Sequence, residues 1–360
     1  MDQRKHIYYL DYLRIFAAVS VVWMHTASSG LQLEPTLGWQ AMNLVTSLAF
    51  TAVPLFFMIS GYLLLSDPRT AEVSTLKTRL PRLLVPLACW SLVAALWNCW
   101  YQRSWNLASL LRELAGALYE PIFMPYWFLY TLLAIYLISP LLRAALAGTG
   151  KQGAKLVVLL AALVSLRAML RPFLPDAWQG YLNLNLLVKL SAWGGYLLLF
   201  LLGWVLGNLD RRIDNRLLLG VALVCYAVIV VGTWRATVAR GSYFGLFQDQ
   251  SAGFEVVLAA CLFLLAKQNL DRPCRWLERS GTVPLLFAVY LIHAPALRVI
   301  TALIYSPQRF LAVSAATVLI FALCLLLAKT FASLPFLCYP LTGLPYRTTG
   351  RRCGWFSSGS

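Results

Sequence analysis

Residues 9–26 read YLDYLRIFAAVSVVWMHT. This stretch is apolar enough to enter a membrane, yet it contains Asp11, Arg14 and His25. A charged side chain in a membrane-spanning helix costs roughly 2.5–3.5 kcal/mol on insertion scales, so charges at such positions usually mark function. The stretch therefore predicts a membrane helix that places ionisable groups inside the bilayer.

The spacing of these residues places them on similar faces of the predicted helix. Arg14 and His25 are 11 residues apart, which is about three turns and about 16–17 Å along the axis. Asp11 precedes Arg14 by three residues, a spacing at which the two side chains can pair. A cation near one membrane surface and an imidazole near the other indicate the lining of a tunnel. The alternative is that Arg14 extends to the lipid headgroups and His25 caps the far end of the helix.

The composition of the whole chain is typical of a membrane protein. Of its 360 residues, 60% are hydrophobic and 12% are charged, and the mean hydropathy is +0.70. Soluble domains are about 45–50% apolar and about 25% charged. Successive apolar runs of about 18 or more residues predict an all-α, polytopic helical membrane protein. The net charge of +16 does not require a nucleic-acid partner, because cytoplasmic loops collect Lys and Arg.

Hydropathy and helix-breaking residues predict about ten membrane spans. We place them at 9–28, 41–65, 83–101, 126–146, 154–171, 186–208, 217–235, 251–267, 283–305 and 310–334. The short amphipathic segment 107–119 is expected to lie along the outer interface. We expect one integral-membrane domain over residues 1–340 and a cytoplasmic tail over 341–360. The eight cysteines form no CxxC pair, and we expect neither a disulfide framework nor a metal site.

The basic residues orient the predicted spans. With the N-terminus in the cytoplasm, 19 of the 30 Lys and Arg residues fall in cytoplasmic segments and 8 in external segments. This bias predicts that both termini are cytoplasmic. It places Arg14 near the cytoplasmic surface, His25 and Glu255 at similar depth near the outer surface, and Glu120 at the outer interface. A carboxylate beside an imidazole is the usual arrangement of a general base, but Glu255 could instead pair with an external Arg.

Six motifs, in order along residues 7–300, resemble the membrane acyltransferases of family three, which transfer acyl groups to cell-surface sugars and other exported acceptors in bacteria. The motifs are LDYLRIFAAVSVVWMHT at 10–26, PLFFMISGYLLL at 54–65, TRLPRLLVP at 78–86, YWFL at 126–129, FLLG at 200–203 and the run from Gly281 to YLIH at 290–293. The compact form of the chain is similar to the common-antigen type of O-acetyltransferase.

The resemblance implies an integral-membrane O-acyltransferase of the bacterial inner membrane, with acetyl-CoA as the expected donor. It implies that His25 removes the proton from the acceptor hydroxyl and that Arg14 positions the donor. It also implies that Lys77, Arg79 and Arg82 hold the phosphates of the donor by charge-assisted hydrogen bonds. Ordinary positive-inside charge is the alternative explanation of these three residues.

The remaining candidates lie toward the outer surface. We assign Glu255 to the catalytic group beside His25, and Glu120 and Trp127 to acceptor binding. Trp127 is alternatively a residue of the aromatic belt at the membrane interface. The pair Ser60–Gly61 is expected to permit close helix packing rather than to supply a catalytic serine.

The expected partners are acyl-CoA, a glycan or lipid-linked glycan acceptor, and membrane lipids, without nucleic acid. A different function, export of a glycan or its precursor, is the alternative, because intramembrane charges are equally expected in a transporter. A transporter would be expected to contain internal repeats with broken helices, and we find no clear repeat in the sequence.

The charge bias makes a testable prediction about topology. A reporter fused after residue 360 should behave as cytoplasmic, and one inserted in loop 29–40, which has no basic residue, should behave as external. Paired alkaline phosphatase and fluorescent protein fusions measure both. The opposite location for either fusion would contradict the predicted orientation.

Overall fold

The computed structural model describes residues 6–32, 35–175, 185–251, 253–304, 306 and 309–345, apart from the side chains of 185–194, 276 and 302–304. The described part is helical. The α-helices are α1 Tyr8–Leu31, α2 Leu37–Ala49, α3 Ala52–Leu65, α4 Leu76–Tyr101, α5 Leu107–Gly116, α6 Trp127–Leu170, α8 Asn185–Gly207, α9 Asn215–Arg240, α10 Phe254–Asn269, α11 Arg275–Ser280, α12 Leu286–Ile304, α13 Phe310–Ser333 and α14 Pro335–Thr342. Short 3₁₀ helices are η1 Pro68–Ala71, η2 Val73–Thr75, η3 Met124–Tyr126, η4 Arg171–Phe173, η6 Gly245–Gln248 and η7 Val283–Leu285.

Six helices among the described residues are long and apolar enough to cross a membrane. The all-helical, polytopic prediction is therefore confirmed. Each expected span overlaps a helix, but the expected span 41–65 is divided between α2 and α3. Pro54 explains the division, because it lacks an N–H and its ring would clash with the carbonyl of Phe50, the C-cap residue of α2, in a continuous helix. Residues 346–360 of the expected tail lie outside the described residues.

The predicted interruption of the helix between the expected spans 126–146 and 154–171 is present in the structure. Both fall within α6, which bends at Gly150. The φ of Gly150 is 52° and its ψ is −126°, a conformation that suits glycine because glycine has no Cβ. A single glycine thus separates the two halves of this long helix.

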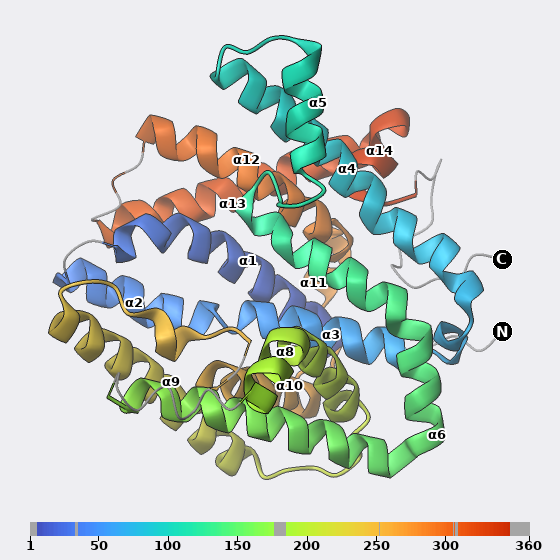
Figure 1. Cartoon of the computed structure of the whole chain (residues 1–360), viewed down its shortest axis with the longest axis vertical. Helices are drawn as coiled ribbons and strands as arrows, with labels where there is room; N and C mark the ends of the chain where they lie inside the picture. The colour runs from blue at the N-terminus through green and yellow to red at the C-terminus, as the bar shows by residue number, and fades with distance from the viewer. Residues whose placement is uncertain are drawn as a thin grey trace. The chain divides into compact units, whose positions relative to one another are not determined.

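The chain forms two compact units. Unit 1 contains Met1–Ala71, Ser139–Cys274 and Ser306–Ala315, and unit 2 contains Glu72–Ile138, Arg275–Tyr305 and Ala316–Ser360. In unit 1, α1 packs against α2, α3 and α10, and α9 packs against α2 and α10 (Figure 1). Edge-to-face contact between Tyr9 of α1 and Phe263 of α10 fills the space between those helices.

Helices α3 and α8 approach each other closely because glycines face backbone at the contact. A Cβ added to Gly61 would lie 1.7 Å from the carbonyl oxygen of Phe200, and one added to Gly203 would lie 2.0 Å from that of Met58. Small residues permit such contact, and van der Waals packing is what holds helices together in lipid. The prediction that Gly61 serves close helix packing is confirmed.

In unit 2, α4 packs against α5, α12 and α14. The Nε1 atom of Trp90 donates a hydrogen bond to the carbonyl oxygen of Leu341 over 3.1 Å, which joins α4 to α14. The hydroxyl of Tyr126 donates to the carbonyl oxygen of Leu291 over 2.8 Å, which joins η3 to α12. Helix α5, in the segment expected to be amphipathic, has no buried residue.

A glycine in the α3–α8 contact and a glycine with open space around it should respond in opposite ways to substitution by alanine. Gly203→Ala should lower the free energy of unfolding by about 1–3 kcal/mol, because the new methyl group overpacks the contact with Met58. Gly220→Ala on α9 is the control, because a Cβ there meets nothing within 4 Å, and it should stabilise the helix by roughly 0.5–1 kcal/mol. Thermal unfolding in detergent measures both. Equal melting temperatures for Gly203→Ala and the wild type would exclude this close approach.

Candidate active site

Helix α1 carries both ends of the predicted site. It runs without a break from Tyr8 to Leu31, and Asp11 lies in its first turn, where a carboxylate interacts favourably with the helix dipole. Arg14 and His25 are therefore held on one rigid element, and the axial separation of about 16–17 Å estimated from helix geometry applies.

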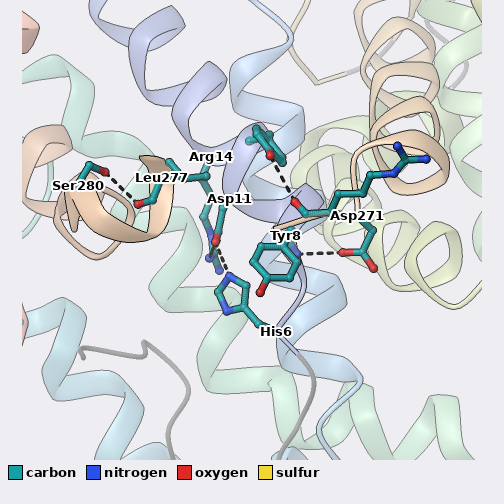
Figure 2. Close-up of polar contacts among 9 residues, drawn as sticks. His6, Tyr8, Asp11, Arg14, Asp271, Leu277 and Ser280 are labelled. Carbon is teal, nitrogen blue, oxygen red and sulfur yellow. Dashed lines mark hydrogen bonds and ion pairs between the residues drawn. The ribbon is translucent and has the colours of Figure 1, made fainter. Parts of the chain in front are cut away.

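At the first end of α1, Asp11 contacts the side chains of Arg14 and His6. Arg14 Nη1 donates to Asp11 Oδ1 over 3.1 Å, which confirms the predicted pair. His6 Nε2 lies 2.6 Å from the other oxygen, Oδ2 (Figure 2). The Asp11 carboxylate is buried, whereas the His6 side chain is 58% exposed. Sequence analysis did not single out His6, because this residue precedes the helix and helical spacing does not apply to it.

The same end of α1 is attached to the segment after α10. The backbone N–H of Tyr8 donates to Asp271 Oδ1 over 2.9 Å (Figure 2). The hydroxyl of Tyr12 donates to the carbonyl oxygen of Arg272 over 3.3 Å. The first N–H groups of a helix have no partner within the helix, so Asp271 supplies one. These contacts fix the position from which Arg14 extends.

At the other end of α1, His25 is partly buried. Its neighbours are fixed by contacts within unit 1. Trp23 Nε1 donates to Thr46 Oγ1 over 2.9 Å, and Gln250 Nε2 lies 3.9 Å from Met24 Sδ. The segment that leads into α10 therefore contacts α1 directly beside His25.

Glu255 lies in the first turn of α10 and is fully buried. Neither carboxylate oxygen has a hydrogen-bond partner among the described residues, so neither His25 nor a described arginine is bonded to it. A buried carboxylate without a partner carries a large desolvation cost. The surrounding fold tolerates that cost, and this is the usual situation of a functional group.

A network of buried polar side chains lies beside Glu255 in unit 1. Gln248 Nε2 donates to Asn43 Oδ1 over 3.2 Å and to Ser47 Oγ over 2.9 Å, and Tyr243 donates to Gln248 Oε1. Burial, and next the nearby Glu255 carboxylate, raise the pKa of Tyr243. The phenol therefore stays protonated and keeps donating. Sequence analysis missed this network, because its members come from segments about 200 residues apart.

The predicted donor-binding residues lie in the first two turns of α4, in unit 2. Lys77 and Arg82 are exposed, and Arg79 is half-buried. Arg79 and Arg82 are three residues apart, so they project from similar faces of α4. Cations near the N-terminus of a helix oppose its dipole, so these residues do not stabilise α4. A helix N-terminus with added cations suits an anionic ligand.

The two predicted acceptor residues also belong to unit 2. Glu120 is exposed in the turn after α5, and Trp127 is the half-buried first residue of α6. Trp127 packs edge-to-face against Phe128, with ring centroids 6.4 Å apart. Arg14, His25 and Glu255 belong to unit 1. Among the described residues, no group of three His, Cys, Asp or Glu side chains is placed to hold a metal ion.

Comparison with known proteins identifies one family. The sequence model of the acyltransferase 3 family, described as an acyltransferase domain, matches residues 7–329. That range contains α1 through most of α13, and therefore every site residue predicted from the sequence. No curated protein and no solved structure matches the chain.

The buried carboxylate yields a prediction about stability. Glu255→Gln should unfold at a temperature no lower than the wild type, because the amide keeps the shape of the side chain and removes the charge, and a buried unpaired charge costs more than a buried neutral polar group. Glu120→Gln is the matched control at an exposed position, and should change stability by less than about 0.5 kcal/mol. A marked loss of stability in Glu255→Gln alone would mean that the carboxylate has a structural partner.

Proposed function

This chain belongs to the acyltransferase 3 family, and from that premise we propose that it transfers an acyl group from cytoplasmic acyl-CoA to a hydroxyl of a cell-surface glycan or glycolipid precursor. The donor is acetyl-CoA and the location is a bacterial inner membrane. The family match supports acyl transfer rather than the alternative of glycan export. The single observation that carries the proposal is that Arg14 and His25 share one unbroken helix.

The proposed topology has about ten spans and both termini in the cytoplasm. The charge bias of the sequence supports it, and each expected span overlaps a helix. The start of α4 and the Arg14 end of α1 then face the cytoplasm, where acyl-CoA is made. His25 faces the outer half of the membrane, where the acceptor arrives. The enzyme thus has to bring a thioester from one side to the other.

On the cytoplasmic side, Lys77, Arg79 and Arg82 bind the phosphates of the donor by charge-assisted hydrogen bonds. The orientation of α4 supports this role, because its N-terminal dipole also favours anions. Arg14 guides the narrow pantetheine arm past the first turns of α1. Asp11 holds the Arg14 guanidinium in place at a distance of 3.1 Å.

On the outer side, His25 accepts the proton of the acceptor hydroxyl as the hydroxyl oxygen attacks the thioester carbonyl carbon. The carbon–sulfur bond breaks, and the CoA thiolate takes up the proton from the imidazolium, which leaves an ester and CoA. Glu255 supplies negative charge near the outer end of α1 and stabilises the imidazolium. Glu120 and Trp127 contact the acceptor, with the indole ring as a stacking surface.

The proposal predicts separable losses in two variants. His25→Ala should reduce acetyl transfer by about 10²–10⁴-fold, because an acceptor hydroxyl is a poor nucleophile without a base. Binding of labelled acetyl-CoA to the same purified sample should stay near the wild-type level. A His25→Ala protein that retains more than about a tenth of wild-type turnover would exclude His25 as the base.

The complementary variant, Arg79→Ala combined with Arg82→Ala, serves as the comparison in the same assays. It should weaken acetyl-CoA binding by about 1.5–3 kcal/mol for each charged hydrogen bond lost, with little change in protein abundance. Unchanged donor affinity in this double variant would assign both arginines to membrane orientation only.

A further inference from the structure

The end of α4 has an unusual residue at a position that favours glycine. The N–H of Ser104 donates to the carbonyl oxygen of Cys99 over 2.9 Å, and the N–H of Arg103 donates to that of Trp100 over 3.1 Å. These two bonds form a Schellman motif, which normally places glycine in the left-handed conformation. Here Arg103 occupies it, with a φ of 53°, and it is the one non-glycine residue with positive φ among the described residues.

Arg103 also lines a surface cavity. Trp100, Tyr101, Arg103 and Trp105 line an open hollow of about 380 Å³. The three aromatic side chains are 56%, 77% and 64% exposed, respectively. Strained backbone conformations cluster at ligand sites, because the surrounding structure must hold them there. Arg103 therefore combines a left-handed backbone conformation with a place in the lining of a cavity. This combination suggests that its guanidinium has a function.

The position of this cavity indicates a membrane interface. Helix α4 is long and apolar enough to cross a membrane, and its candidate span ends at Tyr101. The next helix, α5, has no buried residue and exposes Leu107 and Leu111. Tryptophan and tyrosine gather at the depth of the lipid headgroups, where one end of the ring is apolar and the other is wet. A cavity directly after this candidate span is expected at the depth of lipid phosphates.

We propose that the cavity formed by Trp100, Tyr101, Arg103 and Trp105 binds the phosphate of a membrane phospholipid. The guanidinium matches phosphate in charge and in its planar pair of donors. The indole and phenol rings pack against the glycerol and the first carbons of the acyl chains. An acceptor sugar would also stack on the rings, but it would not need the cation of Arg103. Charge complementarity and depth thus favour the phospholipid.

Native mass spectrometry of the full chain in detergent tests this site without any acyl donor. Bound phosphatidylglycerol is counted during a titration, beside a phosphate-free galactosyl diacylglycerol. The wild type should prefer phosphatidylglycerol. Arg103→Gly should weaken phosphatidylglycerol binding roughly tenfold, as expected for loss of a charged hydrogen bond. Its melting temperature should equal or exceed that of the wild type, because glycine relieves the left-handed conformation.

Two further variants complete the test. Arg103→Gln keeps the strained backbone but removes the charge, and should lose the same preference as Arg103→Gly. Arg112→Gln removes an exposed arginine from the neighbouring helix α5, and should bind phosphatidylglycerol as the wild type does. Unchanged binding in both Arg103 variants would overturn the proposal. An equal loss in Arg112→Gln would also overturn it, because that result indicates diffuse attraction to the headgroups.

Discussion

A charged side chain in an apolar helix has to be compensated within the protein, and the Asp11–Arg14 pair meets this constraint on α1. Arg14 Nη1 lies 3.1 Å from Asp11 Oδ1, and the side chain of Asp11 is only 7% exposed. The pair keeps a permanent cation on a mainly apolar helix. The function proposed for α1 depends on that cation, because Arg14 and His25 act on one donor only if a single rigid helix holds both.

Glu255 also places an ionisable side chain inside an apolar region, but unlike Arg14 it has no bonded partner among the described residues. Its carboxylate is fully buried and has no hydrogen-bond partner among the described residues. Gln248, in the neighbouring network, binds Asn43 and Ser47 and is almost fully buried. The described part of the fold thus provides hydrogen bonds for the Gln248 amide but none for the Glu255 carboxylate. Keeping that carboxylate buried costs stability. That pattern is expected of a group that acts on a substrate.

Arg103 presents a second local conflict, in the backbone rather than in charge. A glycine at this position would satisfy the turn without strain, as Gly241 and Gly343 do after α9 and α14. By contrast, Gly61 and Gly203 suit their positions, because each glycine faces the backbone of the opposite helix and leaves no room for a side chain. Local conflicts of this kind are expected at functional positions.

The sequence by itself determined the helical membrane class, the approximate helix positions and the Asp11–Arg14 pair. These features follow from apolar run length and from i, i+3 spacing, which act within one segment. Only the tertiary structure decided that His6 binds Asp11, that Asp271 caps α1 and that Gln248 binds Asn43. The last two contacts join segments more than 200 residues apart, and His6 precedes the helix, so helical periodicity could not predict any of them. The lack of a bond to Glu255 is likewise a property of packing, since it depends on every side chain that surrounds the carboxylate.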